Sequence, residues 1–227
     1  MCGRYASFTQ AQDLADIFSI DVVSPVAATM LPSWNVAPTD PVRIIREEVT
    51  RGQGVRLLDA ARWGLVPSWA SDPAVGSRLI NARSETVAEK ASFRGPLAYA
   101  RCVVPAEGYY EWQAPPAGRR AKTPYYIHGD DGAPLALAGL YSLWHGELLT
   151  CSIVTRASRG ELAGLHDREP VTLRPAEVDH WLDPTMRDTA EAAAILRAPR
   201  APLRYHRVST MVNTVRNNDP SLIEPAA

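Results

Sequence analysis

The sequence predicts an α+β domain built on many short, mainly antiparallel strands. Three observations predict this class. Apolar runs rich in β-branched and aromatic residues recur along the chain and are divided by Gly-containing turns. A few segments show instead the apolar spacing of amphipathic helices. No repeat, linker or shift in composition divides the 227 residues, so we expect one domain spanning residues 1–227.

The first part of the chain contains one predicted helix and one irregular segment. Thr9-Gln10-Ala11-Gln12 has the pattern of a capping box and precedes an apolar stripe of Leu14, Ile17 and Phe18, which predicts a short surface helix. Ser24–Pro41 carries four prolines and a tryptophan. We therefore expect a fixed loop without regular structure there.

The rest of the chain alternates strands and turns, with two helices near the C-terminus. A turn at Arg51-Gly52-Gln53-Gly54 predicts one hairpin, and Ala114–Thr123 predicts the tip of another. Ser84 is suited to cap a helix, and Pro175 and Asp188 each begin a helical pattern. The predicted strands are Val42–Arg46, Val55–Leu58, Arg101–Pro105, Gly108–Trp112, Tyr125–Ile127, Leu135–Leu140, Leu148–Val154 and Tyr205–Val215.

Composition and charge exclude some classes of protein. Hydrophobic residues make up 46% of the chain, as in a globular protein with a core. No run of about 18 apolar residues is present to span a membrane, and the N-terminus lacks a signal-peptide pattern, so we expect a cytoplasmic protein of bacterial type. The net charge is −1 and the basic residues are arginines except for Lys90 and Lys122. Charge therefore neither supports nor excludes a nucleic-acid partner.

Cys2 is the cysteine that the sequence marks as reactive. Cys102 and Cys151 lie in apolar runs typical of buried thiols, and three cysteines are too few and too far apart for a disulfide framework or a metal site. Removal of Met1 would leave an amine (reference pKa about 7.7–8.0) and a thiol (about 8.5) on Cys2. This aminothiol can condense with an aldehyde to a thiazolidine or attack an ester or amide carbonyl. The alternative is that Cys2 has no special reactivity and is simply the second residue of an ordinary chain start.

Several polar or aromatic residues occupy positions typical of functional sites. Trp63 and Trp69 flank a proline-containing turn, and we expect Trp63 in the core and Trp69 on the surface as a binding residue. Asn81 and Arg83 follow an apolar pair at the end of an element. Glu111 lies between two aromatic residues, which predicts either a pairing cation or a raised pKa.

Six blocks occur in order along the chain. They are Met1-Cys2-Gly3-Arg4-Tyr5, Trp34-Asn35-Val36-Ala37-Pro38, Arg62-Trp63-Gly64-Leu65-Val66-Pro67, Ile80-Asn81-Ala82-Arg83-Ser84-Glu85-Thr86, Gly108-Tyr109-Tyr110-Glu111-Trp112 and His166-Asp167-Arg168-Glu169-Pro170. Together they resemble the SOS-response-associated peptidase (SRAP) family, from Cys2 to the Val212–Asn213 region. The resemblance implies a single α+β domain with a mainly antiparallel, barrel-like β core and flanking short helices.

The resemblance also implies a DNA-damage protein that binds single-stranded DNA and captures abasic sites. The ring-opened abasic sugar carries an aldehyde, which the Cys2 aminothiol is suited to trap as a covalent thiazolidine that shields the lesion. By matching motif, Cys2 is the nucleophile, Asn81 an orienting residue, Glu111 an acid and His166 a proton shuttle. Self-processing peptidase, lyase and cross-link reversal activities are further implications.

A DNA-binding surface follows from the same resemblance. Arg4, Arg83 and Arg168 are assigned to phosphates, and Asn35 to a further DNA contact. Trp69 is assigned to base stacking, as a wedge at a junction of single-stranded and duplex DNA. We expect binding without sequence preference and with strong salt dependence.

Each DNA assignment has an alternative, and the chain departs from the family pattern in places. Arg83 can pair with Glu85, and Arg168 with Asp167 or a neighbour, in solvated ion pairs of little energetic value. Arg156 is a departure that adds a candidate phosphate contact. Glu169 is a second departure from the family pattern, and its charge lowers the local positive potential.

The expected partner is single-stranded DNA that contains abasic sites, including those at junctions with duplex. We expect a monomer, associated with the nucleoid when on DNA, with no metal, no cofactor and no membrane partner. Two other functions compete. One is an N-terminal-nucleophile cysteine peptidase or amidohydrolase that uses Cys2 and His166, and the other is a non-covalent DNA-binding module in which Cys2 only packs.

Overall fold

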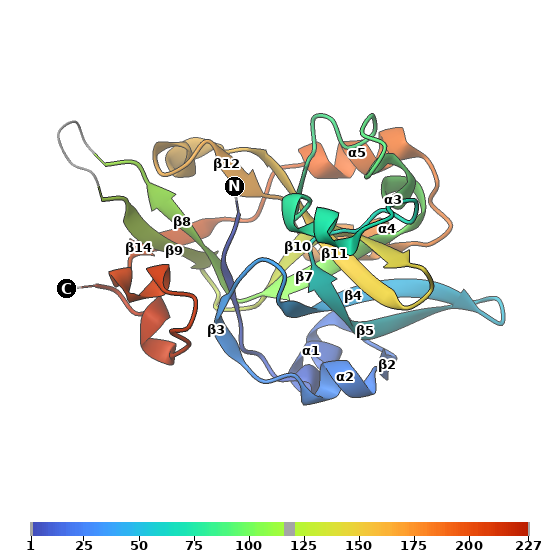
Figure 1. The fold of residues 1–227 in the computed structure, drawn as a ribbon, viewed down its shortest axis with the longest axis horizontal. Coiled ribbons are helices and arrows are strands. Elements are labelled where there is room, and N and C mark those ends of the chain that lie inside the picture. Colours follow the sequence, from blue (N-terminus) through green and yellow to red (C-terminus); the bar gives the residue numbers. More distant parts are fainter. Residues whose placement is uncertain (1, 116–120, 227) are drawn as a thin grey trace.

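The chain folds into two β-sheets with short helices around them (Figure 1). The computed structural model describes residues 2–115 and 121–226. The strands are β1 (Tyr5–Ser7), β2 (Val22–Val23), β3 (Ser33–Val36), β4 (Pro41–Thr50), β5 (Gln53–Trp63), β6 (Asn81–Arg83), β7 (Arg101–Ala106), β8 (Gly108–Gln113), β9 (Thr123–Gly129), β10 (Leu135–Trp144), β11 (Leu148–Ala157), β12 (Arg168–Pro170), β13 (Thr172–Leu173) and β14 (Leu203–Arg207). The helices are α1 (Ala11–Phe18), α2 (Pro25–Thr29), α3 (Arg94–Tyr99), α4 (Pro175–Leu182) and α5 (Thr189–Arg197), and the 3-10 helices are η1 (Pro73–Arg78), η2 (Gly160–Gly164), η3 (Thr210–Asn213) and η4 (Pro220–Ile223).

The larger sheet closes into a ring. Strands β5, β4, β7, β10 and β11 pair in turn by antiparallel ladders, and β11 then pairs in parallel with the end of β5. The smaller sheet, in the order β14-β9-β8-β1-β3, is antiparallel. Figure 1 shows the smaller sheet and the C-terminal 3-10 helices at one end of the molecule and α3, α4 and α5 at the other. The predicted α+β class with a barrel-like, mainly antiparallel core is confirmed.

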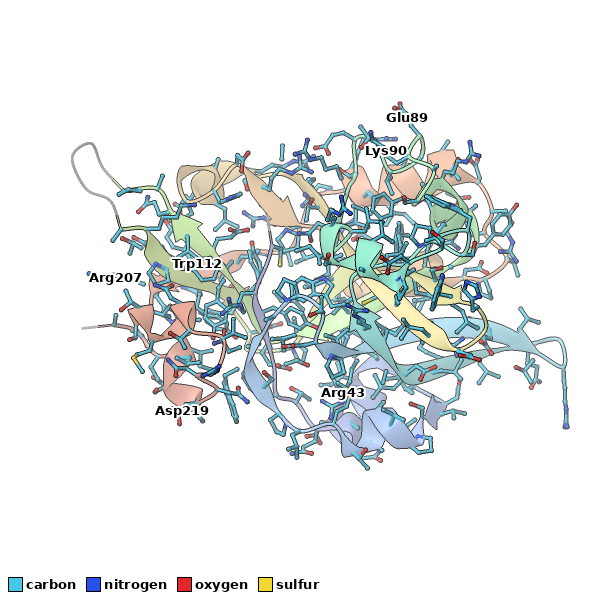
Figure 2. All side chains as sticks on the ribbon, viewed as in Figure 1. Arg43, Glu89, Lys90, Trp112, Arg207 and Asp219 are labelled. Atoms are coloured by element: carbon cyan, nitrogen blue, oxygen red, sulfur yellow. The ribbon has the colours of Figure 1, made fainter. Side chains whose placement is uncertain are left out.

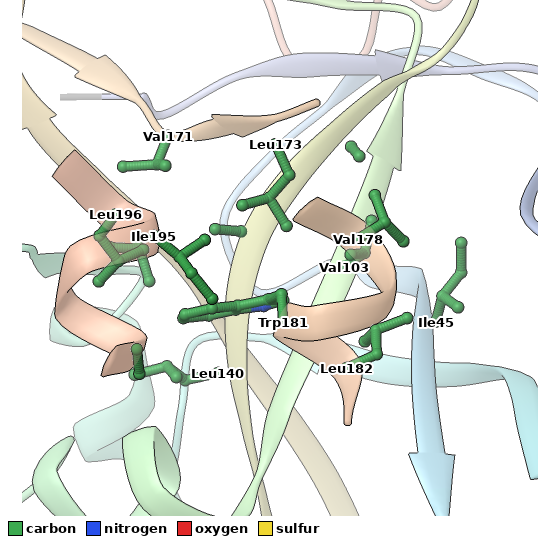
Figure 3. Packing of buried hydrophobic residues seen from close by; sticks show 14 of the residues in the cluster. Ile45, Val103, Leu140, Val171, Leu173, Val178, Trp181, Leu182, Ile195 and Leu196 are labelled. Atoms are coloured by element: carbon green, nitrogen blue, oxygen red, sulfur yellow. The ribbon is translucent and has the colours of Figure 1, made fainter. Parts of the chain in front are cut away.

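One core cluster packs the C-terminal helices against the ring. Trp181 of α4 is fully buried in the same cluster as Ile195 and Leu196 of α5 and Val103 of β7 (Figure 3). Its indole Nε1 donates to the main-chain oxygen of Cys102 at 2.8 Å, which satisfies the polar atom of an otherwise apolar side chain. The helices predicted to begin at Pro175 and Asp188 are thereby confirmed. Within the described residues, no helix has both the length and the apolar character needed to cross a bilayer.

A second core cluster fills the space between the two sheets. It joins Cys2, Tyr5 and Tyr109 from the N-terminal segment and the smaller sheet to Trp63 and other residues of the ring. Trp63 is fully buried, as predicted, and its indole donates to the main-chain oxygen of Ile80 at 2.9 Å. The segment that begins at Cys2 is therefore part of the core.

The structure corrects two predictions for the first part of the chain. Helix α1 forms as expected, but its N-cap is Gln10 and makes no side-chain cap hydrogen bond, so the predicted capping box is wrong. Ser24–Pro41 is not irregular, because Ser24 caps α2, Pro25 occupies its first turn and β3 pairs with β1. Proline is compatible with the first turn of a helix, so the proline content of this segment does not exclude α2.

Two further predictions differ from the structure. No helix begins at Ser84, whose N–H donates instead to Thr155 at 2.8 Å before a series of turns. The last strand ends at Arg207, and η3 follows where the sequence predicted more strand. The other predicted strands form, several of them longer than expected. The hairpin predicted at Ala114–Thr123 has flanking strands β8 and β9 paired up to Gln113 and Thr123, and its tip at 116–120 lies outside the described residues.

Two buried arginines tie loops and helix ends to the sheets. Arg43 of β4 donates to the main-chain oxygens of Ala27 and Met30 near α2 (Figure 2). Arg101 of β7 is 5% exposed. It donates to main-chain oxygens at the ends of α3 and α4, namely those of Leu97, Ala98, Trp181, Asp183 and Met186. Arg101 therefore satisfies carbonyl groups that helix ends leave without an intrahelical partner.

Replacing Arg101 is expected to destabilise the fold strongly. Arg101→Leu removes the donors to five carbonyl oxygens, and buried acceptors without partners should lower the free energy of unfolding by about 3 kcal/mol. Chemical denaturation measures this change. Arg94→Leu, at an exposed position of α3, is the matched control and should change the free energy of unfolding by less than about 0.5 kcal/mol. Equal losses in the two variants would show that the carbonyl contacts of Arg101 contribute little.

Candidate active site

Cys2 lies buried between the two sheets, next to strand β6. Its relative exposure is 0%. Strand β6 pairs in parallel with β11, with Asn81 opposite Ile153. This pairing presents the Asn81 side chain to the N-terminal segment, where its Nδ2 donates to the main-chain oxygen of Cys2 at 2.8 Å. Asn81 therefore fixes the backbone of the predicted nucleophile.

Glu111 is a buried carboxyl group on the neighbouring strand β8. Its side chain is only 5% exposed, because β8 lies between β1 and β9 in the smaller sheet. Burial raises the pKa of Glu111 to about 7, against the opposing effect of the positive N-terminal amine and with a contribution from the charge of Asp167. A carboxyl group with a pKa near neutrality can both give and take a proton under physiological conditions.

His166 lies beside Glu111 at the end of the η2 segment. Its Nε2 is 3.8 Å from Glu111 Oε2. The segment is anchored by buried Leu162 and Leu165, and the N–H of His166 donates to the main-chain oxygen of Leu162 at 3.1 Å. Burial, followed by the positive charge of the N-terminal amine, lowers the pKa of His166. The imidazole is therefore largely neutral at pH 7 and able to exchange protons with Glu111.

The Cys2 thiol is held in its protonated form. Burial, and then the nearby charge of Glu111, raises its pKa well above the usual value, although the N-terminal amine and a hydrogen bond with the Arg4 backbone act in the opposite direction. A thiol in this state is a poor nucleophile. Chemistry at Cys2 in this arrangement is therefore expected to begin at its amine, with the sulfur acting second.

Arg168 and Arg83 lie on strands β12 and β6, which both pair with β11, but in different surroundings. The Arg168 guanidinium forms a two-bonded ion pair with Glu85, at 2.7 and 2.9 Å, and also donates to the main-chain oxygen of Thr155 at 2.8 Å. Arg168 thus forms an ion pair, as the alternative for this residue predicts, but with Glu85 and not with Asp167. Glu85 is therefore the partner of Arg168 where the alternative for Arg83 assigned it to Arg83. Arg83 is exposed on β6, and Arg168 is held in one orientation by its paired bonds.

Arg4 and Asn35 join the N-terminal segment to the C-terminal part of the chain. Arg4 Nη1 donates to Asn35 Oδ1 at 2.7 Å and to the main-chain oxygen of Val212 at 2.8 Å, and its guanidinium carbon lies 5.8 Å from the ring of Trp112. Asn35 is 3% exposed and donates to the main-chain oxygen of Asn217 at 2.7 Å. The expected DNA contact of Asn35 is corrected, because its amide is used in internal hydrogen bonds that orient Arg4.

Arg156 is also internal rather than part of a DNA-binding surface. It is 3% exposed. Its Nε donates to Oε1 of Glu169 at 2.9 Å, and its Nη1 donates to the main-chain oxygen of Ala198 after α5 at 2.6 Å. Glu169 also accepts from Arg200. The two departures from the family pattern, Arg156 and Glu169, therefore compensate each other as a buried ion pair across β11 and β12.

Trp69 is an exposed indole on a tightly held loop. It is 66% exposed, as the sequence predicts. The base of the loop closes through a hydrogen bond from Leu65 N to Leu79 O at 3.2 Å. Gly64 has φ +133°, and a Cβ there would lie 2.6 Å from the oxygen of Gly76, so the two chain segments can approach only without side chains. The Trp69 indole is thus exposed on a loop whose base is held by hydrogen bonding and close backbone packing.

The structure brings the four predicted catalytic residues together from four separate segments. Cys2, Asn81, Glu111 and His166 are linked through the contacts described above. Arg168 borders this cluster, because its main-chain N–H donates to His166 Nδ1 at 3.0 Å. Sequence reasoning assigned Asp167 no role beyond pairing with an arginine, yet its Oδ1 lies 2.9 Å from His166 Nδ1. Its position directly after the predicted histidine is the signal that could have identified it.

Comparisons with known proteins agree on one family. The sequence profile of the SOS response associated peptidase (SRAP) family matches residues 1–215. The abasic site processing protein YoqW of Bacillus subtilis strain 168 is 37% identical over 229 residues, which cover 99% of each chain. The abasic site processing protein HMCES of Gallus gallus is 34% identical over 226 residues, covering 86% of this chain and 66% of that protein. Among solved structures, a protein from Bacteroides thetaiotaomicron superposes with a TM-score of 0.84 at 26% identity over 100% of both chains. A phage-related protein from Bordetella bronchiseptica gives 0.70 at 30% identity, covering 91% of this chain and 94% of the other.

The raised pKa of Glu111 predicts a pH-dependent gain in stability when its charge is removed. The folded state holds a proton on Glu111 up to a pKa of about 7, whereas the unfolded chain releases it near 4.3, so the stability of the native protein falls as pH rises between these values. Glu111→Gln should therefore be more stable than the native protein by about 3–4 kcal/mol at pH 8 and nearly equal to it at pH 4.

Denaturant titrations at the two pH values measure this difference. Glu89→Gln, at an exposed position (Figure 2), is the matched control and should show no pH-dependent change. A Glu111→Gln gain that is the same at pH 4 and pH 8 would contradict the assignment of a raised pKa.

Proposed function

The chain belongs to the SOS response associated peptidase (SRAP) family, and from that premise we propose that it processes abasic sites in single-stranded DNA by covalent capture at Cys2. The observation that carries the proposal is the meeting of Cys2 with Glu111 and His166 in one buried cluster. Relatives at 34–37% identity are named abasic site processing proteins. The cluster supplies a nucleophile and two groups that exchange protons near pH 7.

Capture begins with the amine of Cys2 once Met1 has been removed. The protonated carboxyl group of Glu111 gives its proton to the ring oxygen of the abasic sugar as the bond between that oxygen and the anomeric carbon breaks. The anomeric hydroxyl releases its proton to water, which leaves the open-chain aldehyde. The amine adds to the aldehyde carbon, and loss of one water leaves an imine. The amine acts before the thiol because burial keeps the thiol protonated.

The thiol completes the ring in a second step. Its sulfur adds to the imine carbon while the thiol proton is transferred to the imine nitrogen, through Glu111 or His166. The product is a thiazolidine, and one water is released overall. Asn81 holds the Cys2 carbonyl at 2.8 Å, which keeps amine and sulfur oriented toward the same carbon. Reversal follows the same steps backward, so the same residues serve the release of the cross-link.

The proposed DNA-binding surface consists of Arg4, Arg83, Arg168 and Trp69. Arg83 is exposed on β6, two residues after Asn81. Arg168 is oriented by its paired bonds with Glu85. Phosphate contacts bind without reading sequence, and stacking on an indole accepts any base. Such tolerance suits a lesion that has no base of its own.

Covalent capture is tested with a single-stranded oligonucleotide that carries one abasic site, analysed on a denaturing gel. We expect a shifted band for the abasic strand and none for an intact strand of the same sequence. Cys2→Ala should abolish the band because it removes the thiol that traps the imine. Cys151→Ala, which removes another buried thiol of the same core cluster, is the matched control and should retain it.

Intact mass confirms beforehand that Met1 is absent. A stable shifted band with Cys2→Ala would contradict Cys2 as the trapping residue. No band with any variant would leave a peptidase or a non-covalent DNA-binding module as the function.

Trp69 is expected to contribute to DNA affinity and not to stability. Trp69→Ala removes an exposed stacking surface, whose loss costs about 1–3 kcal/mol and so raises Kd about tenfold for single-stranded DNA. Fluorescence anisotropy with intact oligonucleotides measures this. Tyr99→Ala is a matched control, since Tyr99 is also 66% exposed but lies on α3. If both variants bind like the native protein, Trp69 is not a stacking residue.

A further inference from the structure

Asp167 lies on the solvent side of the proposed catalytic histidine, whose own side chain is 25% exposed. Its Oδ1 lies 2.9 Å from His166 Nδ1, and its side chain is 84% exposed. On the other side of the ring, His166 Nε2 lies 3.8 Å from Oε2 of Glu111, whose side chain is 5% exposed. The imidazole therefore lies between a buried carboxyl group and a solvated one.

The main-chain N–H of Arg168 shares the same ring nitrogen with Asp167. It donates to His166 Nδ1 at 3.0 Å. A donor at Nδ1 favours the neutral tautomer that carries its proton on Nε2, because one nitrogen of a neutral imidazole donates and the other accepts. A carboxylate at Nδ1 favours the opposite tautomer, with the proton on Nδ1 and the lone pair of Nε2 toward Glu111. The two partners thus support His166 both as an acid and as a base toward Glu111.

Building on the proposed function, we propose that Asp167 is the positioning residue of a proton relay that runs from Glu111 through His166 to solvent. When Glu111 has given its proton to the lesion, His166 Nε2 returns one to it while Nδ1 takes one from solvent beside Asp167. One proton enters the ring and one leaves it, so its charge is unchanged. The Arg168 N–H favours the tautomer that the ring has before this transfer, with its proton on Nε2. Asp167 favours the tautomer that the ring has afterwards, with its proton on Nδ1.

A relay is needed because Glu111 has little contact with water. Each cycle of ring opening leaves Glu111 ionised in a site where burial favours its protonated form. A small cavity beside it is lined by Glu111, His166, Arg168 and Glu169 together with apolar residues. His166 Nε2 lies 3.8 Å from the Glu111 carboxylate, and Nδ1 of the same ring faces the solvated Asp167, so the imidazole offers a route for reprotonation.

The charges around His166 determine how removal of the Asp167 charge should change the pKa and the tautomer of the ring. Burial is the largest effect and lowers the pKa of His166. The positive N-terminal amine and Lys122 act in the same direction. Asp167 raises the pKa of His166, and the Glu111 carboxyl group faces the ring from β8. Asp167→Asn keeps the size of the side chain and removes its charge. It should therefore stabilise the neutral ring with its proton on Nε2.

The first test measures the ring directly and needs no DNA. Nitrogen-15 NMR of the histidine side chains, with the His166 signals assigned by their loss in His166→Gln, reports both tautomer and titration midpoint. In Asp167→Asn we expect the midpoint to move to lower pH by about 0.5 pH unit, from the loss of one charge near the ring, and the neutral ring to shift toward the Nε2–H tautomer. Asp167→Glu should restore most of both effects.

Glu161→Gln is the matched control for charge. Glu161 is exposed on η2, five positions before His166, and the substitution changes the net charge of the same segment by the same amount. It should shift the midpoint by less than half as much and leave the tautomer unchanged. Equal shifts in the two variants would overturn the proposal, because the effect would then come from general charge and not from contact with Nδ1.

The second test follows the rate of covalent capture against pH. Asp167→Asn should slow capture about fivefold to tenfold near pH 7 and move the pH profile, with DNA affinity and thermal unfolding unchanged. A merely structural role would alter affinity or unfolding and leave the pH profile in place. Capture that is independent of Asp167 would refute the relay and leave the proposed function standing, whereas absence of capture in the native protein would refute the proposed function itself.

Discussion

The structure depends on the burial of the N-terminal segment between two sheets. Chain termini usually fray, but here β1 pairs with both β3 and β8, and Cys2 lies in the core cluster that joins the sheets. Arg4 adds hydrogen bonds to Asn35 and to the C-terminal segment at Val212. Cys2 is thereby held in a fixed position, which the proposed capture chemistry requires of it.

The same burial sets the chemistry of the site. Removal from water raises the pKa of Glu111 to about 7, raises that of the Cys2 thiol and lowers that of His166. All three effects favour the neutral form of the group. A site of neutral groups suits capture of an aldehyde, because the sequence of steps moves protons between partners and leaves no charged product in the core. It suits peptide hydrolysis less well, since that reaction needs an activated thiolate at the start.

The sequence predicted the parts of this arrangement that arise from local patterns. Hairpins such as β4–β5, the helices at Pro175 and Asp188, and the core position of Trp63 follow from periodicity and turn residues. The four proposed catalytic residues could be selected from motifs, since each lies in a distinctive block. Two limits were physical. Ser24–Pro41 forms α2 and β3 because tertiary pairing with β1 outweighs its proline content. Asn35 and Arg156 are internal because they bind Arg4 and Glu169, and these partners are distant in the sequence. No local pattern reveals such pairs.

The most direct test of covalent capture identifies the bond that holds the DNA. The cross-linked protein is digested with nuclease and protease, treated with a thiol-alkylating reagent, and examined by tandem mass spectrometry. Thiazolidine formation predicts a sugar remnant on the peptide that begins with Cys2, formed with loss of one water, and a Cys2 sulfur that no longer reacts with the reagent. A remnant on another residue, or a Cys2 thiol that is still alkylated, would contradict thiazolidine formation at the N-terminus.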